Sequence, residues 1–151
     1  MCIRDRFKAY QNKDILHLAV HGKSNSSNKY ENCLIVKSSY GLDTIYGYEF
    51  IGLNSGTPLV VLSACETAKG TYQSGEGLYS LKRFFHLSGS ENIVSSLWPV
   101  DDSSSKLFFR EFYSFQSLKI IDKYVASARI LKSKPKYSHP YYWSNYVLSS
   151  G

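Results

Sequence analysis

Two residues with reactive side chains stand directly after apolar segments of this sequence. His21 follows residues 15–20, ILHLAV, and Cys65 follows residues 58–64, PLVVLSA. A free thiol with a pKa of about 8.5 is mostly protonated at neutral pH, whereas an imidazole with a pKa of about 6.5 can accept its proton. A cysteine and a histidine in contact would therefore form an ion pair, and its thiolate could attack a carbonyl carbon.

The segments before these two residues have the pattern of buried strands. Residues 59–62 are Leu-Val-Val-Leu, an apolar run without polar alternation, which is typical of a parallel strand buried on both faces. Ligand sites in parallel sheets lie beyond the carboxyl ends of the strands. If the two strands are neighbours, their ends lie about 5 Å apart, within side-chain reach of a Cys–His pair.

Backbone groups next to the pair could complete a site. Gly22 leaves the backbone open, so its N–H and that of Cys65 could form an oxyanion hole for an acyl-transfer intermediate. Buried cysteines are also common as packed core residues. From the residues alone, a reactive pair and a structural cysteine are both open.

The other predicted elements alternate along the chain. We expect strands over residues 33–36 and 93–97, and helices over 48–53, 78–85 and 120–131, with another helix capped by Asp101-Asp102-Ser103. Gly89 is placed to end the second of these helices, and the aromatic tail 141–148 is expected to pack on the core. This alternation predicts an α/β fold with a parallel sheet covered on both faces.

Three carboxylates near the expected strand ends are candidates for substrate contact. Glu66 would disfavour a thiolate on Cys65, so we favour an arrangement in which its side chain turns to a helix N-terminus or a cation. Asp101 and Asp102 follow the strand 93–97 and could line a pocket for a basic side chain of a substrate. They could equally cap the helix that follows, and both interpretations are open.

The other cysteines and histidines receive no catalytic role. Cys2, Cys33 and Cys65 have neither CxxC nor framework spacing, so we expect no disulfide scaffold, no zinc site and no other metal. Cys33 is expected to be a packed thiol. His17 would lie about 13 Å from His21 along the same strand, and we expect it to be a core histidine.

Composition excludes several classes of protein. With 151 residues, 43% hydrophobic and 15% aromatic, the chain fits one globular domain. No apolar run reaches the roughly 18 residues that span a bilayer, and the N-terminus does not resemble a signal peptide. The odd number of cysteines fits a reducing compartment. We therefore expect a cytoplasmic protein without membrane contact.

Positive charge is concentrated near the C-terminus. The formal net charge is +6, and residues 119–136 contain six basic residues against Asp122 alone. The favoured interpretation is a solvated helix face. The alternatives are binding of RNA, an acidic partner or a membrane surface. Direct nucleic-acid contact is disfavoured, because the stretch lacks interleaved aromatic residues that could stack on bases.

Several blocks of the sequence, in order and in spacing, resemble the CHAT domain family. They are LAVHG at 18–22, VVLSACET at 60–67, GEG at 75–77 and SLWPVDD at 96–102, followed by HPYYW at 139–143 and YVL at 146–148. The resemblance covers residues 14–151; residues 1–13 are set apart as an N-terminal segment, of which Met1–Arg6 matches nothing in the family pattern. It implies a caspase-like three-layer α/β/α sandwich of the clan CD type, with a mostly parallel sheet whose N-terminal strands are missing here.

The resemblance also implies an activity. It carries over His21 and Cys65 as the dyad of a cysteine endopeptidase that cleaves protein substrates and needs no cofactor. CHAT domains typically follow tetratricopeptide repeats, so the resemblance implies a regulatory partner that acts through upstream repeats absent here. An alternative from another class is a non-catalytic module that holds a peptide in the same groove. The presence of both His21 and Cys65 favours the enzyme.

Overall fold

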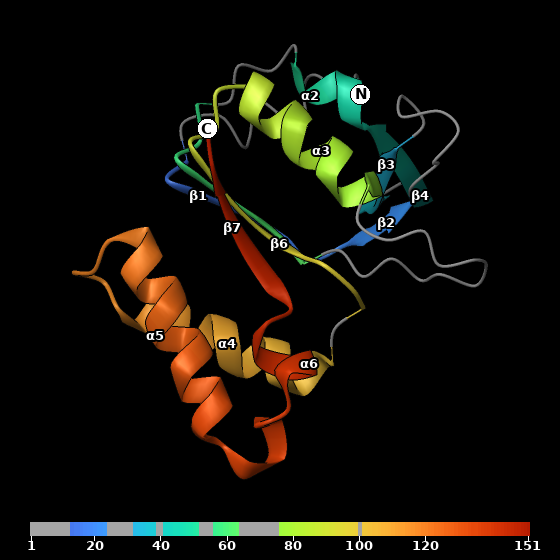
Figure 1. The fold of residues 1–151 in the computed structure, drawn as a ribbon. Coiled ribbons are helices and arrows are strands. Elements are labelled where there is room, and N and C mark those ends of the chain that lie inside the picture. Colours follow the sequence, from blue (N-terminus) through green and yellow to red (C-terminus); the bar gives the residue numbers. More distant parts are fainter. Residues whose placement is uncertain (1–12, 24–31, 39–40, 52–55, 64–75, 100) are drawn as a thin grey trace. The chain divides into compact units, whose positions relative to one another are not determined.

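A computed structural model describes residues 13–23, 32–38, 41–51, 56–63, 76–99 and 101–151 (Figure 1). The chain divides into two compact units. The first comprises Met1–Pro99 with Ser149–Gly151, and the second comprises Val100–Leu148.

The main sheet has four strands, most of them parallel. Their order is β1 (Ile15–Leu18), β5 (Leu59–Leu62), β6 (Asn92–Ser96) and β7 (Tyr146–Ser150). β1 runs parallel to β5, which runs parallel to β6. The N–H of Gly151 donates to the carbonyl of Glu91 at 2.9 Å, so the end of β7 lies beside the start of β6. The predicted α/β class with a mostly parallel sheet is confirmed.

One of the two inner strands of this sheet is buried along its whole length. All four residues of β5 are buried, as its unbroken Leu-Val-Val-Leu run predicts for a parallel strand. β6 lies next to it with Ile93 and Val94 fully buried. β1 is at the end of the strand order, and it buries Leu16 while Ile15 is exposed.

A second, antiparallel sheet was not predicted as such. It contains β2 (His21–Lys23), β3 (Cys33–Ser38) and β4 (Gly41–Tyr46) in that order. Only β3 was predicted as a strand. β4 is hard to detect in the sequence because its apolar residues do not all lie on the buried side. Leu42 is apolar and yet 82% exposed, so apolar and polar residues do not alternate regularly. Gly41 begins β4 with a φ of +121°, a conformation that residues with a side chain rarely adopt.

The first unit has two helices among its described residues, and their buried side chains join one core with residues of the main sheet. The helices are α2 (Gly47–Ile51) and α3 (Glu76–Leu87), which lie next to each other in Figure 1. Leu81, Phe84 and Phe85 have helical spacing and join the core with β-strand residues such as Val60 and Ile93. A Cβ at Gly47 would lie 2.2 Å from Cδ2 of Phe84, so the close approach of the helices requires a glycine there.

The predicted end of α3 is confirmed at Gly89. Gly89 has a φ of +92°, and the N–H of Ser90 donates to the carbonyl of Phe85 at 3.1 Å. This is the hydrogen-bond pattern of a glycine-terminated helix.

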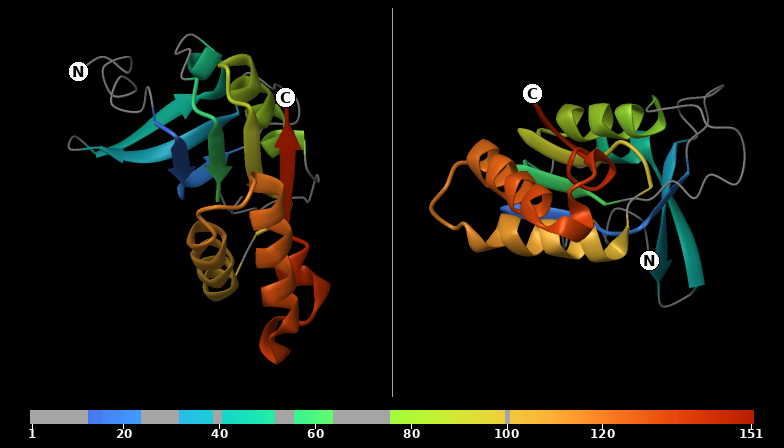
Figure 2. Two further views of the ribbon diagram at one scale, coloured as in Figure 1. Left: turned by 90° about the vertical axis from the view of Figure 1, so that its left-hand side faces the viewer. Right: turned by 60° about the horizontal axis from the view of Figure 1, so that its bottom comes forward.

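The second unit is helical and has an aromatic core. It contains α4 (Asp102–Ser114), α5 (Ile120–Ser133), the short 3-10 helix η2 (Pro135–Tyr137) and α6 (Pro140–Trp143), and α4 packs against α5 (Figure 2). The ring of Phe108 lies 4.6 Å from that of Tyr146, and Phe109 lies 4.9 Å from it. The prediction that the aromatic tail packs on a core is confirmed for Tyr146, whereas Tyr141 is exposed. Burial beside these rings raises the pKa of Tyr113 to about 12.

No helix in the described ranges combines the length and the apolar character needed to cross a membrane.

Candidate active site

The two strands expected to carry the reactive residues are neighbours. Leu18, the last residue of β1, is the register partner of Leu62, the last residue of β5. Beyond these partners the N–H of Ser63 donates to the carbonyl of Leu18 at 3.1 Å, so the carboxyl ends of the strands stay joined. In sequence, His21 and Cys65 each come three positions after these register partners.

The site residues that follow β5 lie outside the described residues. These are Cys65, the predicted nucleophile, and Glu66, a predicted substrate contact. Their assignment stays a prediction, as does the backbone N–H of Cys65 in an oxyanion hole.

His21 occupies a different position from the one expected. The strand predicted over 15–20 ends at Leu18, and His21 instead begins β2, opposite Ile35 of β3. The imidazole is exposed, and in the described part of the chain it has no hydrogen bond or ion pair. Gly22 follows in β2, opposite the buried Leu34. The arrangement leaves the His21 ring accessible to accept a proton.

His17 is not a core residue, and this prediction is wrong. Its side chain is exposed, and β1 is the last strand in the order of the main sheet within the described residues. Its Nε2 lies 3.0 Å from Oγ of Ser63, in a hydrogen bond that spans from β1 to the residue after β5. Partial desolvation of the ring lowers the pKa of His17, which favours the neutral imidazole.

This cross-strand hydrogen bond is a contact that sequence reasoning missed. His17 pairs with Val61, two residues before Ser63. The sequence signal that could have found it is two polar residues, His17 and Ser63, inside segments that are otherwise apolar. The bond holds together the two strand ends from which His21 and Cys65 continue.

We expect Ser63→Ala and His17→Ala each to lower the free energy of unfolding by about 0.5–1 kcal/mol, the low end for a hydrogen bond because His17 is exposed. The His17 contribution should also depend on pH. Because its folded-state pKa is lowered, the stabilisation is complete above about pH 6.5, the unfolded value, and is lost as the pH falls toward the folded value. Urea unfolding at several pH values measures both effects.

The double variant provides the control for this bond. If His17 and Ser63 act through one hydrogen bond, the combined loss should equal either single loss. Losses that simply add would show that the two side chains act separately.

Asp101 has the cap role that was one of its two predicted alternatives. Its Oδ2 accepts a hydrogen bond from the N–H of Ser104 at 2.8 Å, and its carbonyl accepts from the hydroxyls of Ser104 and Ser105. The carboxylate therefore stabilises the N-terminus of α4. Asp102 is exposed in the first turn of the helix. A substrate pocket formed by either residue stays a prediction.

Cys33 behaves as the packed thiol that was expected. It is buried in β3, and burial raises the pKa of its thiol, against smaller opposing effects of the Lys23 charge and backbone hydrogen bond. In the ranges that the structure describes, no group of three or more His, Cys, Asp or Glu side chains could hold a metal ion.

Comparison with known proteins gives a match over nearly the whole chain. The family model described as the CHAT domain matches residues 3–151. Tetratricopeptide repeat protein 28 of Mus musculus is 31% identical over 102 residues, and its Homo sapiens counterpart is 28% identical over 102 residues. In both cases the aligned residues are 66% of this chain and 4% of the relative, so the chain matches a small part of much longer proteins.

Proposed function

Because this chain belongs to the CHAT domain family, we propose that it is a caspase-like cysteine endopeptidase with His21 as the base and Cys65 as the nucleophile. One observation carries the proposal. β1 and β5 are parallel neighbours, and His21 and Cys65 follow register-matched positions by the same number of residues. The exposed and unengaged imidazole of His21 adds support.

The proposed reaction uses groups of this chain alone. His21 accepts the proton of the Cys65 thiol, and the thiolate attacks the carbonyl carbon of a peptide bond. The N–H groups of Gly22 and Cys65 hold the oxyanion, and the imidazolium of His21 donates its proton to the leaving amine. His21 then takes a proton from water, whose oxygen displaces the cysteine from the acyl group. No cofactor takes part.

The finer fold assignment belongs to the same proposal. We infer a caspase-like three-layer sandwich over residues 14–151, because β5 is buried on both faces and so needs cover on each.

The proposed substrates are proteins with a basic side chain before the cleaved bond. Asp102 is the better candidate for that contact, because the carboxylate of Asp101 already caps α4. Glu66 stays a further candidate. The names of the two relatives support regulation by a partner through tetratricopeptide repeats. The proposal includes a cytoplasmic location, where glutathione and thioredoxin keep thiols such as that of Cys65 reduced.

A pH series of iodoacetamide alkylation, followed by peptide mass spectrometry, tests the His21–Cys65 pair. At pH 6.5 about 1% of an ordinary thiol is ionised. Pairing that lowers the pKa of Cys65 by about two units would raise the thiolate fraction roughly 50-fold. The same lower pKa makes each thiolate about eightfold less nucleophilic. We therefore expect Cys65 to react about fivefold faster in the unchanged chain than in His21→Ala. Cys33, whose pKa is raised by burial, should react slowly throughout.

His139→Ala is the matched control, because His139 is also exposed but lies in the second unit, where it caps α6. It should leave the Cys65 rate unchanged. A Cys65 that alkylates like an ordinary thiol with and without His21, in a chain that still binds peptides, would instead support the non-catalytic interaction module.

A further inference from the structure

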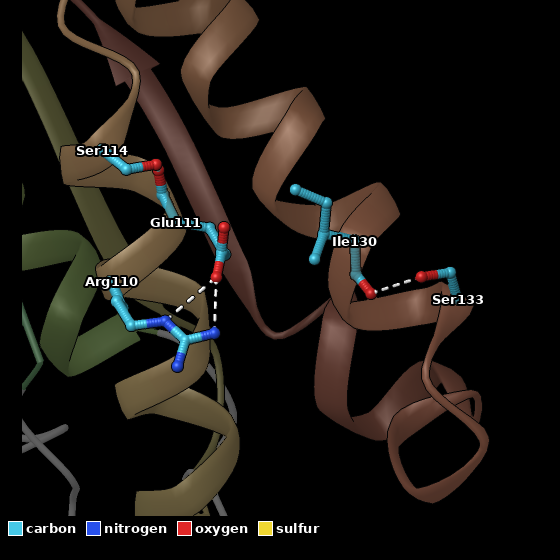
Figure 3. A network of polar contacts seen from close by, with 5 residues as sticks. All are labelled: Arg110, Glu111, Ser114, Ile130 and Ser133. Atoms are coloured by element: carbon cyan, nitrogen blue, oxygen red, sulfur yellow. Dashed lines mark hydrogen bonds and ion pairs between the residues drawn. The ribbon is translucent and has the colours of Figure 1, made fainter.

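The C-terminal end of α5 and the residues after it carry concentrated positive charge, and the acid whose charge acts on Lys136 is Asp101, far away in sequence. Residues 123–151 contain no Asp or Glu, and Lys132, Lys134 and Lys136 are exposed. In the part of the chain that the structure describes, none of the three lysines forms an ion pair. Arg110 of the same unit, by contrast, is paired with Glu111 at 2.7 Å (Figure 3). The three lysines are therefore available to an external anion.

Two of these lysines lie over aromatic rings. The Nζ of Lys132 is 4.9 Å from the centre of the Trp143 ring, and the Nζ of Lys136 is 5.1 Å from that of Tyr137. Attraction between the ammonium and the ring face restrains each flexible side chain. Less conformational entropy is then lost when the ammonium groups bind an anion.

The backbone beneath these side chains is held by its own hydrogen bonds. The Ser133 hydroxyl donates to the carbonyl of Ile130 at 2.8 Å and closes the last turn of α5 (Figure 3). Nε1 of Trp143 donates to the carbonyl of Ser138 at 2.9 Å, and the Ser144 hydroxyl donates to that of Pro140 at 2.7 Å. The charges are therefore presented on an ordered support.

We propose that this basic–aromatic surface, formed by Lys132, Lys134, Lys136, Tyr137, Tyr142 and Trp143, binds an acidic polypeptide segment. The side-chain carboxylates of the segment would pair with the three ammonium groups. The charge of the surface is complementary to such a ligand, since its three cations form no ion pair within the described residues and residues 123–151 contain no acid.

Single-stranded nucleic acid fits this surface less well. Its bases need accessible ring faces on which to stack. Here a lysine already lies on Trp143 and another on Tyr137, and Tyr142 packs edge-on against both Tyr137 and Tyr141. The sequence was expected to lack aromatic residues among the lysines. The structure places aromatic rings beside them, but these rings are already in contact with lysines or with one another.

The test is binding of a dye-labelled poly-glutamate peptide to the whole chain at about 0.15 M salt, followed by fluorescence polarisation. We compare Lys132→Gln/Lys134→Gln/Lys136→Gln with a control triple that removes the same charge elsewhere, Lys37→Gln/Lys119→Gln/Lys123→Gln. Three exposed ion pairs contribute a few-fold each, so the first variant should bind about tenfold more weakly and the control less than about threefold. Arginine at the three positions should restore binding.

Equal losses in both triple variants would overturn the proposal, because the binding would then follow net charge alone. Tighter binding of a labelled oligouridylate than of poly-glutamate, with the same dependence on the three lysines, would show that the ligand of this surface is RNA and not a polypeptide. Absence of measurable poly-glutamate binding would also overturn it. Matching thermal transitions of all variants ensure that only folded chains are compared.

Discussion

Replacement of Cys65 by Ala abolishes peptide hydrolysis if the proposed dyad is correct, because no other group in the mechanism can form the acyl-enzyme. We expect a loss of more than about 10⁴-fold in kcat, down to the background rate. His21→Ala should cost about 10²–10⁴-fold, the usual contribution of a general base. The measurement is the initial rate of cleavage of a fluorogenic peptide library with basic and non-basic residues before the cleaved bond.

Two comparisons make this prediction specific. Asp102→Asn should reduce cleavage after Arg and Lys while leaving Cys65 alkylation unchanged, which separates substrate recognition from the dyad. Cys33→Ala is the matched cysteine control and should leave activity unaltered, since Cys33 is buried in β3. Hydrolysis that persists in Cys65→Ala would exclude this residue as the nucleophile.

Phe108→Ala should destabilise the second unit more than any surface substitution. The side chain is fully buried, and its ring contacts the rings of Phe109, Phe112, Tyr124 and Tyr146. Truncation of a buried Phe costs about 3–5 kcal/mol through lost burial and the remaining cavity. That is a large part of the roughly 5–15 kcal/mol that keeps a domain folded. The melting temperature should fall by about 6–20 °C in calorimetry.

Tyr141→Ala is the control for aromatic truncation in the same unit. Tyr141 is 43% exposed, so its removal leaves no closed cavity and should cost well under half as much. Phe108→Leu should also lie between the unchanged chain and Phe108→Ala. Equal losses for Phe108→Ala and Tyr141→Ala would contradict the assignment of Phe108 to the core.

The parts of the fold that were predictable are those with strong local signals. The strand predicted over 58–64 is β5 (Leu59–Leu62), and the one over 93–97 is β6 (Asn92–Ser96), because runs of branched apolar residues suit buried parallel strands. The cap of α4 at Asp101 was predictable from residue type. β2 was missed because three residues containing Gly22 and Lys23 carry no alternation, and its pairing with β3 is a tertiary effect.

The candidate site was predictable in topology but not in detail. The predicted pair depended on the adjacency of the strands that carry His21 and Cys65, and the structure meets this condition by pairing β1 with β5. The exposure of His17 could not be predicted, because its apolar neighbours suggest a buried strand while the place of β1 in the strand order depends on the whole fold. The start of β2 at His21 depends likewise on its distant partner Ile35.

The pairing of β1 with β5 also bears on when the protein could become reactive during its synthesis. The residues of the second sheet and α2 lie between β1 and β5 in the sequence, so Ile15 pairs with a distant residue, Leu59. Between β5 and β6 the structure describes only the helix α3. Contacts between distant residues form slowly because loop-closure entropy must first be overcome. In the proposed mechanism His21 arrives with β1, so a nascent chain would carry Cys65 as an ordinary thiol. The protein would thus become chemically active only after its main sheet has closed.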